Sequence, residues 1–469
     1  MSRDTEPAIR PGTPGLNFDT TIAAVASGVP SAISIIRISG PNAHSVLDKV
    51  VIRKSKSSSA EPLSWRKLLL CSVIDPQTNR VVDEPLCAFF RAPYSYTGED
   101  MVEMFCHGGP YIVSKVLEIL YAQGIEAAKA GEFTYRAYLN GKMDLTQAEG
   151  VRALTQAQTT HQWAAAKQLY GGRLSTLIAD LRNHLISACA FLNARIDFPE
   201  EGDVKIELDQ AVELVRKVQH SINDLTASYD KGRISTQGLR VALIGQPNVG
   251  KSTLLNTILR CERAIVTDIA GTTRDYIEET CLIKGRLIRI IDTAGIREAD
   301  NIVEKMGVEK SLKLASQSDL VLLISSADIA PTPEWQQISA EIERSVDVIK
   351  IVSKADLPLP SWVSNGYLPL SCKSGHNLGR LEDALVEKID SCVLKNEEDV
   401  CITSTRHLHA LTVASNCLEK FFVARGEGLY DECLMFELEQ ALKALSEVIG
   451  HVDAEDIFDK IFSEFCIGK

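Results

Sequence analysis

The chain has 469 residues, and at about 150 residues per domain this length predicts roughly three domains. Its net charge of −12 argues against a protein that coats nucleic acid through bulk electrostatics, because such proteins present a broad basic surface. The twelve cysteines include no Cys-x-x-Cys pair, which fits neither a disulfide framework nor a structural zinc site. No run of about 18 apolar residues occurs, so no membrane span is predicted.

The N-terminal part of the chain alternates short apolar runs with turn residues. One such run covers residues 32–38 and ends at the turn sequence Ser39-Gly-Pro41. This pattern predicts an α+β domain over residues 17–143.

The spacing of apolar residues changes to three and four after about Asp144, which is typical of amphipathic helices. Two stripes come first, formed by Leu174, Leu177, Leu181, Leu185, Ala188 and Leu192 and by Val212, Val215, Val218, Ile222 and Leu225. Two more follow residue 393, formed by Leu434, Leu438, Leu442, Leu445 and Ile449 and by Ile457, Ile461 and Phe465. We interpret these stripes as the core faces of one discontinuous helical domain, with parts at 144–237 and 394–469.

Between these two parts, residues 238–393 alternate strand-like runs with helix-like segments. The clearest strand-like runs are 287–291, 320–324 and 348–352. Such alternation predicts a parallel sheet with helices on both faces. The simplest interpretation is an α/β domain inserted into the helical domain.

The sequence Gly245-Gln-Pro-Asn-Val-Gly-Lys-Ser252 is a phosphate-binding loop, placed between an apolar strand-like run and a helix-like segment. Two glycines five residues apart allow a tight turn in which backbone N–H groups and the helix N-terminus face phosphate oxygens. Lys251 adds a positive charge, and Ser252 offers a hydroxyl to Mg²⁺. The order of strand, loop, lysine, hydroxyl and helix makes a chance match very improbable.

The base is indicated by Ser353-Lys-Ala-Asp356, which follows the strand-like run 348–352. The Asp356 carboxylate can accept both N1–H and the exocyclic amine of guanine, a donor pair that adenine lacks. The Lys354 stem can cover the base plane, and backbone N–H groups of Ser371-Cys-Lys373 can meet guanine O6. The set resembles the motifs of small GTPases, which prefer Asn or Thr at Ser353, so a weaker steadying hydrogen bond and a lower nucleotide affinity are expected.

Two further motifs suit the metal and the γ-phosphate of GTP. Asp292-Thr-Ala-Gly295 ends a strand-like run, where its carboxylate can reach the Mg²⁺ shell and its glycine N–H the γ-phosphate. Gly271-Thr-Thr-Arg-Asp275 supplies Thr273 as a second Mg²⁺ ligand, and a loop held only by that contact would relax after hydrolysis. Ile296 stands where a Ras-like enzyme has a water-orienting glutamine. Arg274 is either an arginine finger or a structural ion-pair partner, and both interpretations stay open.

The predicted GTP-binding residues are Asn248, Val249, Gly250, Lys251, Ser252, Thr253, Thr267, Asp268, Ile269, Ala270, Gly271, Thr272, Thr273, Asp292, Thr293, Ala294, Gly295, Ser353, Lys354, Ala355, Asp356, Ser371, Cys372 and Lys373.

From about Thr20 to Lys469 the chain resembles the MnmE (TrmE) family of GTPases, which modify wobble uridine in tRNA. The phosphate loop and residues 267–275 carry part of this resemblance. The rest lies in Tyr96-Thr-Gly-Glu-Asp100, His107-Gly-Gly-Pro110, residues 131–142 and the terminus Phe465-Cys-Ile-Gly-Lys469. The resemblance implies an N-terminal α+β folate-binding domain and a Ras-like P-loop GTPase domain inserted into a discontinuous helical domain.

The resemblance also implies K⁺ in place of an arginine finger. Its ligands would be Asn248 and backbone oxygens of Thr267, Ile269 and Thr272, although Asn248 taken alone could merely cap a turn. A cation that bridges the phosphates offsets the charge that develops in the transition state. The family's water-orienting acid corresponds to Glu304, which would act through a bridging water.

For the N-terminal domain the resemblance implies binding of 5,10-methylene-tetrahydrofolate, with 5-formyl-tetrahydrofolate as an analogue. The matching positions are Arg37, Glu103, Lys142 and Lys469. Glu103 could accept the guanine-like donor edge of a pterin, and the cations could pair with its glutamate tail. For Arg37 an ion pair at a strand end is an equally weighted interpretation. Cys466 is treated as a site residue of open role. Ser27-Gly-Val-Pro-Ser31 replaces the glycine-rich turn of bacterial members.

The implied partners are a second copy of the chain, an FAD-containing protein resembling MnmG (GidA), and tRNA shared with that protein, with no membrane. A glycine-derived or a taurine-derived group would use the same scaffold. Residues 26–28 and Cys372 look more like the mitochondrial version, so a mitochondrial location is expected, with bacterial cytoplasm as the alternative. The competing hypothesis is an Era-like or Der-like GTP switch in ribosome assembly that performs no modification chemistry.

Overall fold

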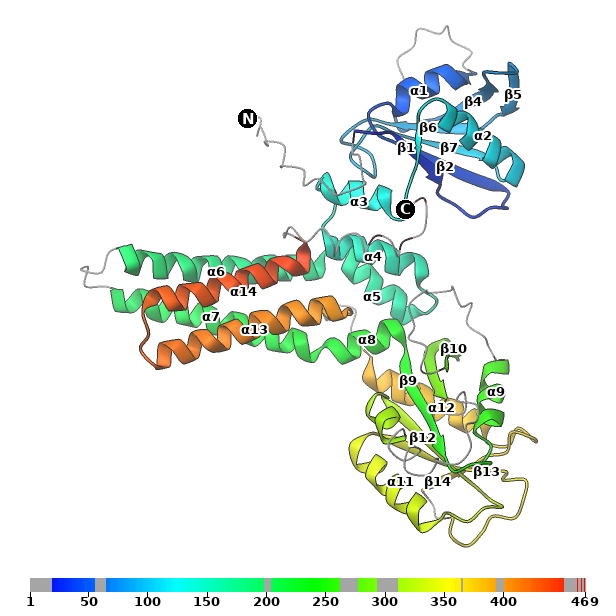
Figure 1. Ribbon diagram of the computed structural model, residues 1–469, viewed down its shortest axis with the longest axis vertical. Coiled ribbons are helices and arrows are strands. Elements are labelled where there is room, and N and C mark those ends of the chain that lie inside the picture. Colours follow the sequence, from blue (N-terminus) through cyan, green and yellow to red (C-terminus); the bar gives the residue numbers. More distant parts are fainter. Residues whose placement is uncertain are drawn as a thin grey trace, which may run out of the picture. The chain divides into compact units, whose positions relative to one another are not determined.

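The computed structural model describes residues 19–54, 65–197, 204–261, 277–292, 311–363, 366–393 and 400–450, together with residues 462, 465 and 468. The chain forms two compact units, whose helices and strands are labelled in Figure 1. The first contains Met1–Arg152, Leu169–Asn183 and Leu442–Lys469, and the second contains Ala153–Gln168 and His184–Ala441. The predicted domain boundaries stay predictions.

The first unit is built on a largely antiparallel sheet in the order β3-β4-β6-β7-β2-β1-β8, with β5 beside β4 and a parallel pair formed by β1 and β8. Its strands are β1 (Ile22–Val25), β2 (Ile33–Ser39), β3 (Val51–Arg53), β4 (Leu68–Asp75), β5 (Arg80–Asp83), β6 (Leu86–Phe90), β7 (Met101–His107) and β8 (Glu126–Ala127). Helices α1 (Ala43–Val50) and α2 (Pro110–Ala122) contribute apolar side chains to the core on one face of this sheet. The α+β prediction for this part is confirmed.

Strand alternation divides the residues of this sheet between two faces. Ile36 and Met104 are neighbours in register and belong to the core under α1 and α2. Arg37 and Glu103, one residue along each strand, are also in register and therefore lie on the other face. The same face carries exposed apolar side chains of β4 and β6. It is thus both partly apolar and the location of two predicted folate residues.

Three shorter helices follow the sheet in the chain: α3 (Glu132–Leu139), α4 (Leu145–Gln156) and α5 (Thr160–Tyr170). Leu145 and Ala148 of α4 pack with Tyr135 of α3 and with Phe462 and Phe465 near the C-terminus. The first unit therefore contains residues from both ends of the sequence.

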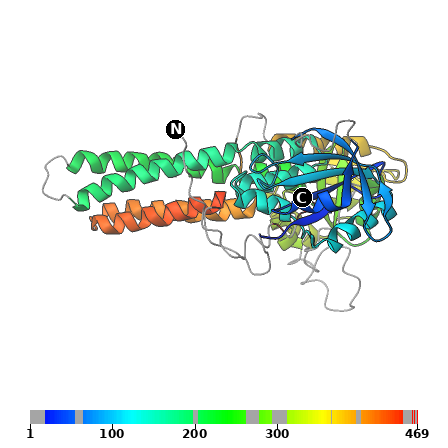
Figure 2. The same cartoon turned by 90° about the horizontal axis from the view of Figure 1, so that it is seen from above.

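The long helices are α6 (Arg173–Asp197), α7 (Val204–Ala227), α13 (Thr405–Gly426) and α14 (Asp431–Ile449). Within the second unit, residues 184–197 of α6, α7, α13 and residues 431–441 of α14 lie side by side (Figures 1 and 2). Arg195 of α6 pairs with Asp431 of α14 at 2.9 Å, and Gln219 of α7 donates to Ser415 of α13 at 2.8 Å. The stripes predicted over 174–192 and 212–225 are buried apart from the half-buried Leu177, so they are core faces as expected. Among the described residues, no helix combines the length and apolar character that crossing a membrane requires.

A second sheet occupies the middle of the sequence, in the order β10-β11-β9-β12-β13-β14. Its strands are β9 (Leu239–Gly245), β10 (Ile277–Ile283), β11 (Arg286–Asp292), β12 (Leu320–Ser326), β13 (Val348–Ser353) and β14 (Tyr367–Pro369). Only the β10–β11 pair is antiparallel within the described sheet. The expected parallel sheet is confirmed.

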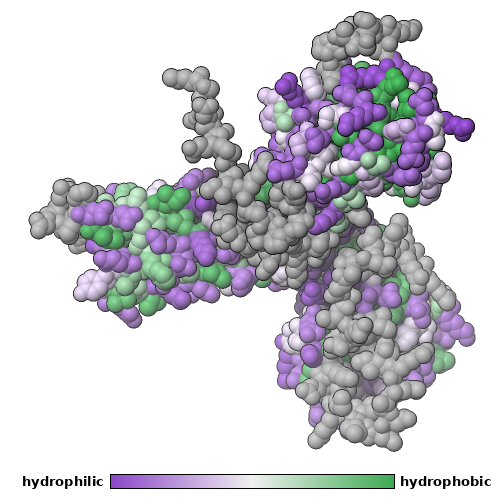
Figure 3. All heavy atoms as spheres, turned by 45° about the horizontal axis from the view of Figure 1, so that its top comes forward, coloured by the Kyte–Doolittle hydropathy of each residue, from purple (hydrophilic) through white to green (hydrophobic). Residues whose placement is uncertain are grey.

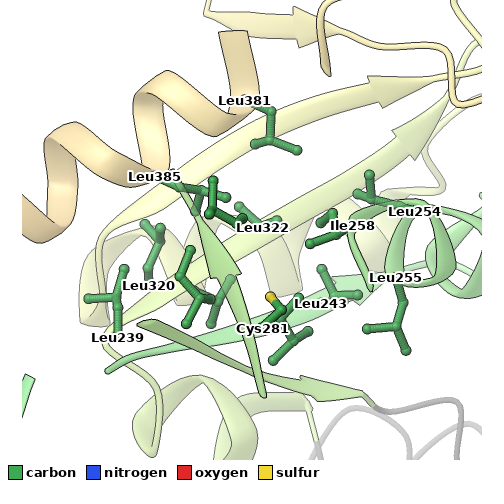
Figure 4. Packing of buried hydrophobic residues seen from close by; sticks show 14 of the residues in the cluster. Leu239, Leu243, Leu254, Leu255, Ile258, Cys281, Leu320, Leu322, Leu381 and Leu385 are labelled. Carbon is green, nitrogen blue, oxygen red and sulfur yellow. The ribbon is translucent and has the colours of Figure 1, made fainter. Parts of the chain in front are cut away.

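Both faces of this sheet are buried, as a parallel sheet requires. Val241 and Leu243 of β9 belong to the core shared with α9 (Lys251–Cys261) and α12 (Leu378–Cys392), part of which Figure 4 shows. Ala242 and Ile244 belong to the opposite core, which includes α11 (Pro333–Ser345). This sandwich of helices around β9 fixes the place where the phosphate loop leaves the sheet.

Helix α8 (Tyr229–Gln237) leads into β9, and the chain returns beside it after the second sheet. Ile402 N donates to Ser228 Oγ at 3.3 Å, and a β-carbon on Gly232 would lie 2.2 Å from Ile402 O. Arg233 donates to both carboxylate oxygens of Asp319 at the start of β12. The entry to and return from the α/β segment are thus adjacent, which is the arrangement of an inserted domain.

Candidate nucleotide and folate sites

The phosphate loop connects the end of β9 to the start of α9 through an unusual backbone path. Asn248 has a φ of +62° and Gly250 a φ of +96°. A β-carbon on Gly245 would lie 2.3 Å from Ile324 O of the neighbouring strand β12, so this position requires glycine. The two glycines predicted from spacing therefore have different roles, one in close strand contact and one in the left-handed turn.

The charged and hydroxyl groups of this motif lie at the N-terminus of α9. Lys251 Nζ donates to Gly245 O and Gln246 O, each at 2.8 Å, so the ammonium is held against the loop that it follows. Ser252 and Thr253 are exposed in the first helical turn. The backbone N–H groups and the partial positive charge at a helix N-terminus favour phosphate binding.

The base-recognition residues lie in loops that follow neighbouring parallel strands. The 353–356 segment begins at the last residue of β13, and the 371–373 segment follows β14. Ser371 Oγ donates to Asp356 Oδ1 at 2.8 Å, and Ala355 N donates to Leu370 O at 3.1 Å. The structure therefore brings the two predicted base-recognition motifs together at one edge of the sheet.

The environment of Asp356 keeps its carboxyl group ionised. The hydrogen bond from Ser371 contributes most to a lowered pKa, followed by the residue's own backbone N–H and the charges of Lys373 and Lys354. An ionised carboxylate only accepts hydrogen bonds, and guanine presents two adjacent donors. Asp356 is thus suited to the role that its sequence position predicts.

Lys354 is held by a residue that the sequence interpretation did not select. Its Nζ lies 2.7 Å from Asp328 Oδ2, and Ser326 also donates to Asp328. The signal for Asp328 would have been its position just after the strand-like run that forms β12. Asp328 fixes the lysine stem that is expected to cover the base.

Ser353 stands where small GTPases prefer Asn or Thr, and a weaker steadying hydrogen bond was expected there. Its Oγ lies 2.5 Å from Val249 O in the phosphate loop and 3.1 Å from Ser325 O at the end of β12. The contact is therefore present in this chain. The expected reduction of nucleotide affinity stays a prediction.

In the first unit, Arg37 and Glu103 form an ion pair with side chains that are 17% and 18% exposed. Arg37 Nε and Nη2 both approach Glu103 Oε1, at 3.0 Å and 2.9 Å, and Nη1 donates to Gly468 O at 3.3 Å. The guanidinium also lies over the rings of Tyr96 and Phe133, with centroid distances of 5.0 Å and 5.6 Å. The ion-pair interpretation of Arg37 is confirmed, and Glu103 Oε2 takes no hydrogen bond from the described residues.

Lys142 belongs to the same unit, where its Nζ donates to Pro93 O at 3.0 Å. Tyr96, Phe133 and Gly468 were not selected from sequence as neighbours of Arg37. Tyr96 and Phe133 did belong to the quoted motifs, which is the signal that could have found them.

The remaining predicted site residues lie outside the described part of the chain: Thr267, Asp268, Ile269, Ala270, Gly271, Thr272, Thr273, Thr293, Ala294, Gly295, Glu304, Cys466 and Lys469. Arg274, Ile296, Ile457 and Ile461 also lie outside it, and only the backbone of Asp292 is described. Roles assigned to these residues stay predictions.

The described cysteines and acidic residues are scattered through the fold. All ten described cysteines are free, and seven of them are buried. Within the described ranges, no group of three or more His, Cys, Asp or Glu side chains could hold a metal. Hard cations such as Mg²⁺ prefer oxygen ligands, and the exposed Ser252 hydroxyl and Asn248 amide oxygen at the phosphate loop fit that chemistry.

Two family models match the chain: "GTP-binding protein TrmE N-terminus" over residues 21–142 and "MnmE helical domain" over residues 145–466. The chain is 40% identical over 446 residues to the "tRNA modification GTPase MnmE" of Aquifex aeolicus (strain VF5), which covers 94% of this chain and 97% of that one. It is 36% identical over 463 residues to the protein of the same name from Natranaerobius thermophilus, with 96% and 100% covered. Among solved structures, the G domain of T. maritima FeoB is 27% identical, covers 32% of this chain and 98% of that chain, and has a TM-score of 0.23, too low to support an argument.

Proposed function

The chain belongs to the MnmE family of tRNA modification GTPases, and we propose that its GTP hydrolysis is stimulated by potassium and serves modification at C5 of the wobble uridine, position 34 of tRNA. The observation that carries this proposal is that the two predicted guanine-recognition motifs meet, through the Ser371–Asp356 hydrogen bond, in a chain whose flanks match the TrmE N-terminal and MnmE helical models. An Era-like or Der-like switch would share the pocket but has no reason to carry these flanks. The modification function is therefore favoured over the regulatory switch.

Hydrolysis needs the triphosphate to be held and its developing negative charge to be offset. Lys251 and the N-terminus of α9 bind the phosphates, and Asp356 selects guanine. The proposed cation ligands are the hydroxyls of Ser252 and Thr273 for Mg²⁺, and Asn248 with the backbone oxygens of Thr267, Ile269 and Thr272 for K⁺. When bound, the two cations supply positive charge next to the phosphates. Glu304 would orient the attacking water, in place of the glutamine that Ile296 replaces.

The N-terminal unit is proposed to bind 5,10-methylene-tetrahydrofolate, which would supply the one-carbon unit. Arg37 approaches Oε1 of Glu103 with two nitrogens, so Oε2 is available to accept the donor edge of a pterin. Tyr96, which is partly exposed, lies beside the same guanidinium and offers an aromatic ring, and the buried Phe133 ring supports the guanidinium. Lys142 and Lys469 would pair with the carboxylates of the folate tail.

We propose that a second copy of the chain covers the outer face of the N-terminal sheet. Hydrophobic as well as hydrophilic residues reach the surface of the protein (Figure 3). Leu68, Leu70 and Leu86 are 58%, 45% and 42% exposed, and Leu70 lies opposite Leu86 in register. Exposed apolar clusters of this kind are commonly protein interfaces, and self-association places the same patch on both partners. Leu86→Glu is expected to yield monomers in sedimentation velocity, whereas an unchanged dimer would place the interface elsewhere.

An FAD protein resembling MnmG is the proposed partner in the uridine chemistry, with tRNA bound largely through that partner because the chain is acidic. The proposed location is the mitochondrion, and immunofluorescence of the tagged protein would test it. The alternative location is the bacterial cytoplasm, which would apply if the gene came from a bacterium.

The potassium mechanism is tested by comparing GTP turnover of the full chain in KCl and in NaCl at equal ionic strength. Wild type should be faster in KCl, and Asn248→Ala should lose that difference while it still binds GTP. Equal rates in both salts for wild type would remove potassium from the mechanism.

The modification function is tested by deleting the gene and measuring uridine 34 by mass spectrometry of isolated tRNA. Loss of the modified nucleoside is expected, with rescue by the wild-type gene and no rescue by Lys251→Ala. Unchanged tRNA in the deletion strain would exclude the modification function. The mass of the lost nucleoside would also show whether the added group derives from glycine or from taurine.

A further inference from the structure

Ser353 is a buried hydroxyl that joins three segments around the nucleotide site. The residue is 6% exposed. Its Oγ lies between Val249 O of the phosphate loop and Ser325 O of β12, and its own carbonyl accepts a hydrogen bond from Ala327 N at 3.1 Å. Ser353 therefore contacts both the phosphate-binding and the base-binding parts of the site.

The chemistry of a hydroxyl limits what this residue can do for the base. Serine has one O–H donor, whereas an asparagine amide has two N–H donors. Both near neighbours of Ser353 Oγ are carbonyl oxygens that only accept, so its single proton is used inside the protein. An asparagine at this position could serve a carbonyl and the base at the same time.

The other side chains of the base pocket are also engaged. The ammonium of Lys354 is paired with Asp328. Asp356 only accepts hydrogen bonds, and so matches the N1–H and amino donors of guanine. The acceptor O6 is left to backbone N–H groups of residues 371–373. Guanine N7 is an acceptor too. The single proton of Ser353 is used inside the protein and the Asp356 carboxylate has none, while the Lys354 ammonium is held against Asp328.

We propose that Ser353 is a positioning residue that links the phosphate loop to β12 and leaves guanine N7 without a side-chain donor. The site then distinguishes guanine by its N1–H, amino and O6 groups alone. Ser353 contacts the loop that it positions through Val249 O, and the serine is close enough to Gly250 that a β-carbon added there would lie 3.7 Å from its Oγ. This inference rests on GTP binding by the chain.

The test compares GTP with 7-deaza-GTP, in which a C–H group replaces N7, by competition against a fluorescent GDP analogue on the full chain with Mg²⁺ and KCl. Wild type should bind the two nucleotides with affinities that agree within about twofold. Ser353→Asn should acquire a preference for GTP of about fivefold, the effect of one neutral hydrogen bond. A preference for GTP of about fivefold or more in wild type would overturn the proposal, because the serine or another group would then donate to N7.

The positioning role is tested with Ser353→Ala and Ser353→Thr. Loss of the hydroxyl removes the hydrogen bonds to Val249 O and Ser325 O and should weaken binding of both nucleotides equally, by about 5- to 30-fold, with KM affected more than kcat. Threonine keeps the hydroxyl and should restore binding. Ser345→Ala is the matched control, because that hydroxyl donates to Ile342 O at the end of α11. Wild-type affinity in Ser353→Ala would refute the link, and absence of any guanine-nucleotide binding by wild type would instead contradict the GTPase function.

Discussion

Arg233 of α8 and Asp319 at the start of β12 form the ion pair that joins the helical part of the second unit to its sheet. Arg233 Nη1 lies 3.1 Å from Oδ2 and Nη2 lies 2.5 Å from Oδ1, a two-bond geometry that only arginine provides. The side chains are 9% and 17% exposed, so solvent screens the pair little. Arg233→Ala is expected to destabilise this junction strongly.

The magnitude follows from what the substitution leaves behind. Removal of one partner from a buried pair costs about 3–5 kcal/mol, because the remaining charge is buried and uncompensated. Asp319 would keep the hydrogen bond from Arg240 N, at 2.8 Å, and its partial exposure, which reduce this cost. We therefore expect about 2–4 kcal/mol, and about half of that for Arg233→Lys, which retains the charge and one hydrogen bond.

Hydrogen exchange of peptides from β9 and β12, measured by mass spectrometry, reports on this junction without assuming two-state unfolding. A loss of about 2 kcal/mol raises exchange from opened states about 30-fold. The matched control is Arg425→Ala, since Arg425 pairs with Asp209 at 3.1 Å with side chains 33% and 66% exposed, and such a pair contributes about 0–1 kcal/mol. Equal exchange in Arg233→Ala and Arg425→Ala would show that burial of the pair does not determine its contribution.

Three further substitutions are expected to have measurable effects. Asp356→Asn replaces one carboxylate oxygen, an acceptor, by an amide NH2 donor. GTP affinity should therefore fall about 100-fold and XTP affinity should rise in nucleotide titrations. An unchanged preference for GTP would contradict the assigned role of Asp356. Asp83 accepts hydrogen bonds from the backbone N and ring Nδ1 of His107, and the bond to the ring raises the pKa of that imidazole above 6.5. The pair therefore stabilises the fold fully below about pH 6.5, and this contribution is lost as pH rises through the raised pKa. Urea unfolding should show this pH dependence, and His107→Gln should remove it. Gly245→Ala should weaken GTP binding at least about tenfold because its β-carbon would lie 2.3 Å from a backbone carbonyl of β12, whereas Gly379→Ala, with open space at its β-carbon, should bind GTP normally.

The elements of this protein follow from local patterns in the sequence. The stripe of leucines predicted over 174–192 lies in α6, and the run predicted at 320–324 lies in β12. Apolar residues that recur every 3.6 residues in a helix, or every second residue in a strand, indicate which face of the element is buried. This spacing can be read from the local sequence alone. The phosphate loop is predictable for the same reason, because strand, glycines, lysine and helix are consecutive.

The sequence by itself determined the nucleotide, since Asp356 and the phosphate loop are recognisable as short consecutive motifs, and the order of the domains, since the periodicity changes along the chain. Only the tertiary structure decided which distant residues meet: Ser353 with Val249, Lys354 with Asp328, and Arg37 with Glu103. Those contacts depend on strand order and register, which hydrophobic period does not specify. Ser353 could be noticed in the sequence because it belongs to a short consecutive motif. Its hydrogen bonds to Val249 O and Ser325 O could not, because these residues are distant in the sequence and are brought together only by the order and register of the strands.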